Sequence, residues 1–352
     1  MVRIGVVGCG GIARDNHLPA FAALPKRCKL VALCDVEIEK ARALGAKFSV
    51  AQVFSDHRRL LEQSEIDAVV VATPNRFHLT PTIDALGAGK HVLCEKPLGR
   101  TFAEAAAMAK AAKAAGKVLQ VGFQLRFSGP VRFLEDMIAA GRFGEIYYAR
   151  AQALRRRGVP NWGVFIDKEK QGGGPLIDIG IHVLDLTLHL MGRPKALSVL
   201  GMTWDKLGTD PSIFNQFGDY DRSQFSVEDM AVGLIRFEGG ASVVVETSFM
   251  ANIEGNPYQT QLFGTRAGAI LKPFADDALR VFTEENRQLL DLTPAHIPKT
   301  QPHIAAAEAF LDAVEGIRPT PIPAEHGLEL NGIIDALYRS AASGHEERVE
   351  SG

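Results

Sequence analysis

Side chains that can move a proton stand at two separate places in this sequence of 352 residues. Lys96 lies in the tetrapeptide Cys-Glu-Lys-Pro at 94–97, and Asp178 precedes His182 by four positions. A lysine ammonium can stabilise negative charge that develops on a substrate oxygen. An aspartate can fix the tautomer of an imidazole that acts as a general base. The plainer interpretations are a surface lysine in a turn and a helix with satisfied polar residues.

Two further residues of the same kinds follow His182. Asp185 and His189 are again four positions apart, so a continuous helix would place positions 178, 182, 185 and 189 on one face. We expect His189 to pack in or near the core, because apolar residues surround it. A metal site is the rival interpretation, but we expect none, because the sequence has no HExxH motif and no Cys–His cluster.

A glycine-rich segment near the start predicts a dinucleotide site. The sequence Gly-Cys-Gly-Gly-Ile-Ala at 8–13 matches the pattern G-x-G-x-x-A. Gly8 would allow the tight turn, and Gly10 would let the backbone approach a pyrophosphate at the start of a helix. Gly11 and Ile12 continue the loop. Ala13 would keep the helix close to the sheet.

Asp35 stands 27 positions after Gly8, at the end of the second expected strand. A carboxylate there can accept both ribose hydroxyls of an adenosine and would repel a 2′-phosphate. Glu37 adds a second negative charge, so we expect NAD to be preferred over NADP. NADP stays possible, because Lys40 and Arg42 could reach the same place. The plainer interpretation is that Asp35 caps the next helix.

The elements that must position these residues alternate in the first third of the chain. We expect strands at 3–7, 29–34, 68–72, 91–94 and 118–121, and helices at 12–24, 36–48, 81–88 and 102–115. This order predicts a parallel sheet covered on both faces. Ligands of such sheets bind beyond the carboxyl ends of the strands, which is where Lys96 stands.

The pattern changes after residue 124 to long β-rich runs. We expect a helix at 131–140, a turn at 238–240, helices at 302–316 and 325–342, and strands at 145–153, 197–203, 229–237, 241–249, 258–263 and 269–272. These elements predict a largely antiparallel sheet with helices on one side. The polar tail at 344–352 is expected to be frayed.

Five features in this order resemble the glucose–fructose oxidoreductase, inositol dehydrogenase and rhizopine catabolism (Gfo/Idh/MocA) family. They are the glycine loop, Asp35, the segment Ala-Thr-Pro-Asn at 72–75 with His78, the Glu-Lys-Pro motif at 95–97, and Asp178-Ile-Gly-Ile-His182. The resemblance covers nearly the whole chain. It implies an α/β fold in which residues 1–124 form a Rossmann dinucleotide-binding domain. Residues 125–352 would form a substrate-binding and oligomerisation domain with a large, mostly antiparallel open sheet.

The resemblance also implies roles for individual residues. Lys96 would polarise the reacting hydroxyl or carbonyl, His182 would exchange its proton, and Asp178 would orient both the substrate and His182. Residues expected to line the cofactor are Thr73, Pro74, Asn75, His78 and Glu95, with Gln124 touching the nicotinamide. Arg126 would face the substrate or form an interdomain salt bridge.

Substrate contacts are expected from the second region. Asn161 and Trp162 could offer an amide and a stacking face to a sugar or cyclitol, and Asp185 could bind a substrate hydroxyl. One of the three arginines at 155–157 could bind a carboxylate or phosphate. The plainer interpretation of these arginines is a solvated strand edge whose charge blocks sheet pairing. The loop at 217–229 could close over the substrate or reach a neighbouring subunit.

Composition limits the classes of partner. The 39 Lys and Arg against 41 Asp and Glu give a net charge of -2, which offers no general attraction to nucleic acid. No run reaches the roughly 18 apolar residues of a membrane span, and no secretory leader is expected. The four cysteines contain no CxxC pair, and we interpret them as free thiols of a cytoplasmic protein. The resemblance implies a homodimer or homotetramer formed through the C-terminal sheet.

The sequence thus predicts an NAD(P)-dependent oxidoreductase, with NAD preferred, that acts on a secondary hydroxyl of a sugar, sugar acid or cyclitol. An NAD-dependent glycosidase of the same superfamily is one alternative. A dinucleotide-binding sensor without turnover is another, although such relatives would be expected to lose Lys96 or His182.

Overall fold

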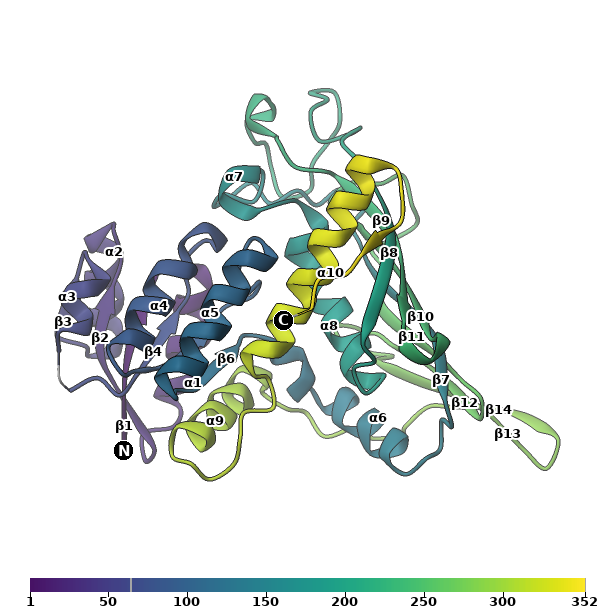
Figure 1. Ribbon diagram of the computed structural model, residues 1–352, viewed down its shortest axis with the longest axis horizontal. Helices are drawn as coiled ribbons and strands as arrows, with labels where there is room; N and C mark the ends of the chain where they lie inside the picture. The colour runs from purple at the N-terminus through teal and green to yellow at the C-terminus, as the bar shows by residue number, and fades with distance from the viewer. Residues whose placement is uncertain (64, 352) are drawn as a thin grey trace. The chain divides into compact units, whose positions relative to one another are not determined.

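Two units make up the chain in the computed structural model, which describes residues 1–63 and 65–351 (Figure 1). The first unit contains Met1–Gln124 together with Gln301–Asn331, and the second contains Leu125–Thr300 with Gly332–Ser351. The division therefore falls within helix α10 (Ala324–Ser343). The sequence predicts a single boundary after residue 124. That boundary would place residues 301–331 in the second domain.

A six-stranded parallel sheet forms the centre of the first unit, in the order β3-β2-β1-β4-β5-β6. Its strands are β1 (Val2–Val7), β2 (Cys28–Cys34), β3 (Gln52–Phe54), β4 (Ala68–Val71), β5 (His91–Cys94) and β6 (Leu119–Val121). All four residues of β4 are buried, as expected for a central strand covered on both faces. Strand order reverses between β1 and β4, which is where sheets of this kind form their ligand crevice.

Helices cover this sheet. They are the π-helix η1 (Ala13–His17), α1 (Leu18–Ala22), α2 (Ile38–Phe48), α3 (His57–Leu61), η2 (Asn75–Phe77), α4 (Leu79–Gly87), α5 (Phe102–Ala115) and α9 (Pro302–Val314). The hydroxyl of Thr101 caps α5 by accepting a hydrogen bond from the Glu104 amide, and Gly116 ends it in a left-handed conformation. Both signals are readable in the sequence.

Helix α9 belongs to the first unit although it lies 180 residues beyond β6 in the sequence. It packs beside α1 (Figure 1), and its Phe310 and Leu311 join the core cluster that also contains Ile4 of β1. Arg27 forms ion pairs with Asp312 and Glu315 at the same contact. Apolar periodicity predicts such a helix but does not identify the sheet that it covers.

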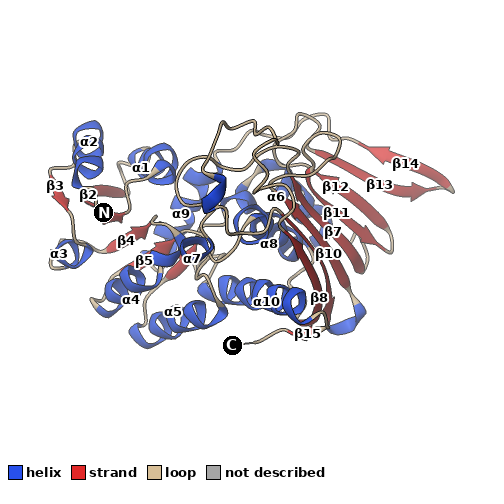
Figure 2. Cartoon of the chain, turned by 90° about the horizontal axis from the view of Figure 1, so that it is seen from above, coloured by secondary structure: helices blue, strands red, loops and turns tan. Residues whose placement is uncertain are grey.

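A nine-stranded mixed sheet forms the second unit, in the order β14-β13-β12-β11-β7-β10-β9-β8-β15 (Figure 2). The strands are β7 (Ile146–Leu154), β8 (Ala196–Trp204), β9 (Met230–Phe237), β10 (Ser242–Ser248), β11 (Tyr258–Gly264), β12 (Ala267–Leu271), β13 (Leu279–Glu285), β14 (Gln288–Leu292) and β15 (Glu347–Arg348). Apart from the parallel pair β7–β10, neighbouring strands are antiparallel. The predicted fold class is confirmed.

Helical segments of the second unit are α6 (Gly129–Ala139), α7 (Lys168–Gln171), η4 (Leu176–Gly180), α8 (Ile181–Leu190), η5 (Arg222–Gln224) and η6 (Glu238–Gly240). The short helix η3 (Gln124–Phe127) spans the division between the units, as α10 does. Helix α8 packs on β7 and β11, against one face of the sheet (Figure 2). The predicted turn between β9 and β10 is confirmed, because Gly239 and Gly240 both have positive φ, at 80° and 90°.

Two features of this sheet are not predicted by the local sequence. The hairpin β13–β14 turns at Asn286 and Arg287, which both have positive φ without being glycine. The tail was expected to be frayed, which is wrong for Glu347 and Arg348, because they pair with β8 as β15. The last residue of that tail, Gly352, lies outside the described residues.

Candidate active site

The glycine loop after β1 has a conformation that requires its first glycine. Gly8 has a φ of +97°, and a Cβ atom there would lie 2.4 Å from the carbonyl oxygen of Ala72 on the neighbouring strand's end. Gly10 and Gly11 are exposed, and a Cβ atom on either would meet nothing within 4 Å. The loop therefore closes tightly against β4 and leaves open space above its exposed backbone.

Asp35 ties the end of β2 to this loop. Its Oδ2 accepts a hydrogen bond from the Cys9 amide at 2.8 Å, and its Oδ1 accepts one from the Glu37 amide at 2.9 Å. The helix-cap interpretation does not hold, since the N-cap residue of α2 is Glu37. Each carboxylate oxygen has a second lone pair that a hydroxyl donor can use.

The two cations that could serve a 2′-phosphate, Lys40 and Arg42, are already paired with nearby carboxylates. Lys40 Nζ lies 2.5 Å from Glu37 Oε1, and Arg42 Nη1 lies 2.5 Å from Glu39 Oε1. An additional 2′-phosphate would have to compete for these cations with Glu37 and Glu39, and it would face Asp35 as well.

Lys96 follows β5 and is the one residue from Val92 to Gly99 that is not fully buried. Its amide donates to Oε2 of Glu95, and Oε1 of Glu95 lies 2.7 Å from Nε2 of the buried His17. Gly122 allows this packing, because a Cβ atom there would come within 2.9 Å of Glu95 Oε1. The family resemblance implies a place for Glu95 beside the cofactor, but no motif in the sequence marks His17.

His78 is fully buried between two loops that the sequence assigns to the site. Its Nδ1 lies 2.8 Å from the Pro97 carbonyl oxygen and its Nε2 lies 2.9 Å from the Thr73 carbonyl oxygen. Burial lowers the pKa of His78, although both carbonyl groups oppose that change. The expected direct contact with a cofactor needs correction, because both ring nitrogens face these carbonyls. His78 holds the loop of Thr73, Pro74 and Asn75 against that of Lys96.

Asp178 and His182 are the only residues from Gly173 to Leu188 that are not buried. The segment is a π-helical turn, η4, which passes directly into α8, so the expected continuous α-helix is modified at Asp178. The Asp178 amide donates to the Gly174 carbonyl oxygen at 3.0 Å. Gln124 is similarly the one partly exposed residue from Val121 to Gly129.

A buried carboxylate that sequence analysis left unassigned holds the start of this segment. Oε2 of Glu228 accepts from the Gly174 amide at 2.9 Å, and Oε1 accepts from the Leu176 amide at 3.2 Å and from the Tyr338 hydroxyl at 2.8 Å. Burial raises the pKa of Glu228, and these hydrogen bonds oppose the rise. We call these contacts the Glu228 clasp.

Close packing around the Glu228 clasp explains the glycine run at 172–174. A Cβ atom on Gly173 would lie 2.0 Å from the Tyr338 hydroxyl oxygen, and one on Gly174 would lie 2.2 Å from the Glu228 carbonyl oxygen. The three successive glycines were the signal in the sequence that another group approaches the backbone here.

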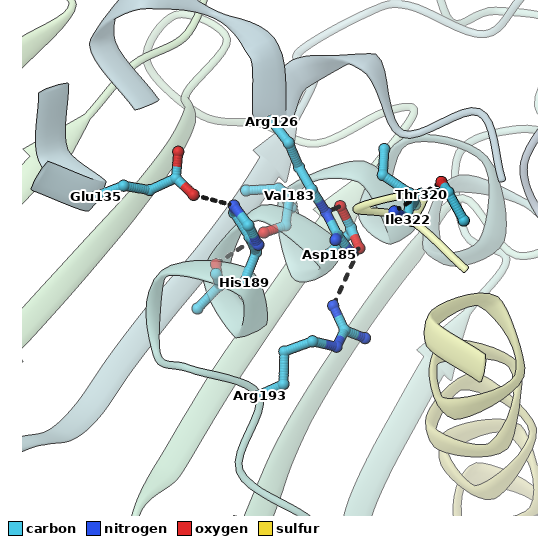
Figure 3. Close-up of polar contacts among 9 residues, drawn as sticks. Arg126, Glu135, Val183, Asp185, His189, Arg193, Thr320 and Ile322 are labelled. Atoms are coloured by element: carbon cyan, nitrogen blue, oxygen red, sulfur yellow. Dashed lines mark hydrogen bonds and ion pairs between the residues drawn. The ribbon is translucent and has the colours of Figure 1, made fainter. Parts of the chain in front are cut away.

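Asp185 belongs to a buried ion cluster within the second unit (Figure 3). Its Oδ2 accepts from Arg126 Nε at 2.8 Å, its Oδ1 pairs with Arg126 Nη2, and Arg193 Nη1 lies 3.4 Å from the same oxygen. His189 Nε2 lies 2.6 Å from Glu135 Oε1 of α6. Asp185 is only 1% exposed, so its expected contact with a substrate hydroxyl does not fit this geometry.

The same cluster bears on the interpretation of Arg126 as one half of an interdomain salt bridge. Its partner Asp185 lies in the same unit, so the ion pair is not one between domains. The side chain is buried, and its Nε and Nη2 groups both hold Asp185, which fixes η3 to α8.

Exposed aromatic residues gather near Asn161 and Trp162. The Trp162 ring is 54% exposed and lies 5.3 Å from the Phe217 ring. The Arg155 guanidinium lies 5.5 Å from the same Phe217 ring, and its Nη1 donates to the Gly158 carbonyl oxygen. Burial lowers the pKa of Arg155, and the charge of Asp178 acts in the opposite direction. Arg155 therefore places a positive charge beside the Phe217 ring of this aromatic group.

The three arginines at 155–157 do not guard a sheet edge, so that interpretation is wrong. They follow β7, which pairs with β10 on one side and β11 on the other. The positive charge there needs another explanation.

The four cysteines are buried free thiols, as predicted. Burial raises the pKa of Cys9 to about 12 and that of Cys28 to about 11, which makes the reactive thiolate scarce at neutral pH. Over residues 1–63 and 65–351, no group of three His, Cys, Asp or Glu side chains is arranged to hold a metal ion. Within the same ranges, every helix is too short or too polar to cross a membrane.

Comparison with known proteins identifies the class. Residues 2–123 match a family described as "Oxidoreductase family, NAD-binding Rossmann fold", and residues 131–270 match the GFO/IDH/MocA C-terminal domain. D-glucoside 3-dehydrogenase from Escherichia coli (strain K12) is 39% identical over 350 residues, which cover 99% of this chain and 97% of that protein. The chain belongs to the Gfo/Idh/MocA family of oxidoreductases, so the resemblance inferred from its motifs is confirmed.

More distant relatives agree with this assignment. Myo-inositol 2-dehydrogenase from Thermotoga maritima is 27% identical over 81% of this chain and 79% of its own. A structure of levoglucosan dehydrogenase in complex with NADH superposes with a TM-score of 0.86 at 25% identity, covering 100% of both chains.

Proposed function

We propose that this protein oxidises a secondary hydroxyl group of a sugar, sugar acid or cyclitol, with NAD preferred as the hydride acceptor. The observation that carries the proposal is selective exposure. Lys96, Asp178 and His182 are each partly exposed within stretches that are otherwise buried, although Nδ1 of His182 is itself buried. Membership of an oxidoreductase family with an NAD-binding domain supports the redox class.

The residues of the first unit fit a dinucleotide. The backbone amides of Gly10, Gly11 and Ile12 would face the pyrophosphate. Gly10 and Gly11 are exposed, and a Cβ atom on either would meet nothing within 4 Å. Asp35 would accept the ribose hydroxyls with its remaining lone pairs. The rest of the dinucleotide would be lined by Thr73, Pro74, Asn75 and Gln124. Glu95 and His78 would hold the loops of the site in place. Bound NAD supplies the acceptor for the hydride that leaves the substrate carbon.

Lys96 and His182 would divide the proton chemistry between them. The Lys96 ammonium would donate a hydrogen bond to the reacting oxygen and stabilise its growing negative charge. The His182 imidazole would accept the hydroxyl proton as a general base, and Asp178 would hold both the imidazole and the substrate in place. Loss of that proton from oxygen leaves the electron pair that forms the carbonyl double bond as the hydride departs.

The substrate class rests on the second unit and on the relatives. Trp162 offers an exposed ring face for a sugar ring, and the exposed Asn161 offers an amide. The relatives named above act on a D-glucoside, on myo-inositol and on levoglucosan, according to their names. We assign Asp185 and Arg126 a positioning role instead of a substrate contact.

An oligomer through the outer sheet face is part of the same proposal. Leu200, Met202 and Trp204 alternate along β8 and are all exposed, as is Leu234 on the adjacent β9. Such a contiguous apolar surface is typical of a protein interface. We propose that two or four copies associate through it.

The direct test is NADH formation by the purified protein from NAD⁺. The panel contains methyl glucosides, levoglucosan, inositols and sugar acids, and NADP⁺ is tested beside NAD⁺. Saturable NADH formation with at least one of them is expected. Release of an aglycone without net NADH would favour the glycosidase alternative, and tight NADH binding with no turnover on any compound would contradict the proposal.

A further inference from the structure

A basic cavity lies in the second unit beyond the carboxyl end of β7. It has a volume of about 480 Å³ and is lined by Arg156, Arg157, Phe214, Gln216, Gly255 and Asn256. None of these residues is acidic, and two carry a permanent positive charge. Small-molecule sites in proteins commonly have volumes of about 300–1,000 Å³. The cavity is therefore large enough for a monosaccharide-sized ligand.

Hydrogen bonds fix the loops that line this cavity. These bonds do not neutralise the positive charge of its arginines. Asn215, which is 3% exposed, joins the loop of Phe214 and Gln216 to Val159 through bonds of 3.0 and 2.9 Å and also donates to the Gly218 carbonyl oxygen. Elsewhere in the lining, the Arg156 amide donates to Asn256 Oδ1 at 2.7 Å. That bond leaves the Nδ2 donors of Asn256 for other partners.

The two guanidinium groups have different functions. Arg157 Nη1 donates to the carbonyl oxygens of Arg156 and Ala251, and its Nη2 donates to Asn252 Oδ1, so this group is held in place by neutral acceptors. The Arg156 guanidinium has no hydrogen bond or ion pair within residues 1–63 and 65–351. One cation is thus pre-positioned and the other is available. In the part of the chain that the structure describes, neither guanidinium forms an ion pair with a carboxylate.

Most polar groups that line the cavity are hydrogen-bond donors, which favours a negatively charged ligand. Guanidinium groups and amide NH₂ groups together offer several N–H donors, the arrangement that binds phosphate or carboxylate oxygens. Phe214 is 70% exposed and adds an apolar face to the same cavity. Because β7 is a central strand, these charges do not serve to protect a sheet edge.

We propose that this cavity binds the oxyanion group of a small sugar-like ligand, a phosphate or a carboxylate, with Arg156 as the main contact and Arg157 as a fixed second charge. The proposal goes beyond the oxidoreductase function. It is tested by binding alone, so it can fail or succeed whether or not turnover is found.

Isothermal titration at constant ionic strength tests it with three probes: glucose 6-phosphate, glucuronate and uncharged glucose. The variant is Arg156→Gln, which removes a charge without breaking a hydrogen bond of the fold. The matched control is Arg287→Gln, which makes the same charge change in the exposed β13–β14 turn. Thermal unfolding of both variants checks that they fold.

We expect the wild type to bind at least one charged sugar more tightly than glucose. Arg156→Gln should weaken that binding by about tenfold or more, as for one lost charge-assisted hydrogen bond, and Arg287→Gln should leave it unchanged. Preference for the phosphate or the carboxylate probe identifies the oxyanion. The proposal is overturned if the wild type binds neither charged probe, or if Arg156→Gln binds them as tightly as the wild type does.

Discussion

At the scale of single residues, Asp185 shows how a buried charge is maintained. A carboxylate at 1% exposure is tolerated because Arg126 and Arg193 face it. Asp185→Asn should therefore lower the free energy of unfolding by about 3–5 kcal/mol, because it leaves Arg126 buried without its counter-charge. Denaturant unfolding measures this loss. The control is Asp291→Asn, which breaks an exposed pair with Arg280 and should cost less than about 1 kcal/mol. Equal losses would contradict the account.

The same pair predicts a pH dependence. Burial alone would raise the pKa of Asp185, but the charge and hydrogen bonds of Arg126 together with the charge of Arg193 oppose it, and the net pKa is lowered. A lowered pKa in the folded state stabilises the protein above the unfolded pKa of about 3.9. That contribution is lost as the pH falls through the lower folded pKa. Wild-type stability should thus drop more steeply than that of Asp185→Asn below about pH 4 in thermal unfolding, and parallel curves would exclude this role.

Asp35 carries the expected preference for NAD. Asp35→Ser should lower the ratio of kcat/KM for NAD⁺ to that for NADP⁺ by about tenfold or more, since it removes both a ribose acceptor and the charge that repels a 2′-phosphate. Steady-state kinetics with both cofactors gives this ratio directly. If the ratio does not change, Asp35 serves only to hold the Cys9 and Glu37 amides.

At the scale of elements, the Glu228 clasp fixes the position of η4 and hence of Asp178. Gly174→Ala would place a Cβ atom 2.2 Å from the Glu228 carbonyl oxygen, so the loop must move and the proposed catalytic segment with it. We expect turnover to fall by about tenfold or more, because catalytic geometry is sensitive to shifts near 1 Å. Gly87→Ala in α4 is the matched control, since a Cβ atom there meets nothing within 4 Å. Wild-type turnover in Gly174→Ala would show that the clasp does not position this segment.

Local elements with strong signals were predictable from the sequence, and contacts between distant segments were not. Thr101 and Gly116 mark the two ends of α5, and the glycine pair at 239–240 marks its hairpin. The partners of α9, β15 and Glu228 depend on which surface a segment meets, which no local pattern records. Asp185 shows that local spacing can also mislead among the candidate site residues. Its spacing from His182 suggested that it binds the substrate as well. The partner that buries it, Arg126, is 59 residues away.

At the scale of the whole molecule, the apolar face of β8 and β9 predicts association. Light scattering should give the mass of two or four chains. Leu200→Lys should reduce it towards that of one chain, because a charge would then be buried in the interface. Ile317→Lys alters an exposed apolar residue of the first unit and should leave the mass unchanged. A wild-type mass equal to one chain would end the oligomer proposal.

In the proposed mechanism, Lys96 and His182 act on the reacting group and not on cofactor binding. The measurement that tests it most directly combines turnover with NADH affinity, determined by fluorescence titration, for Lys96→Met and His182→Ala. Turnover should fall by about 100-fold or more in each variant, as for the loss of an acid–base group, while NADH affinity should stay within about twofold. Wild-type turnover in either variant, or an equal loss of turnover and of NADH affinity, would contradict it.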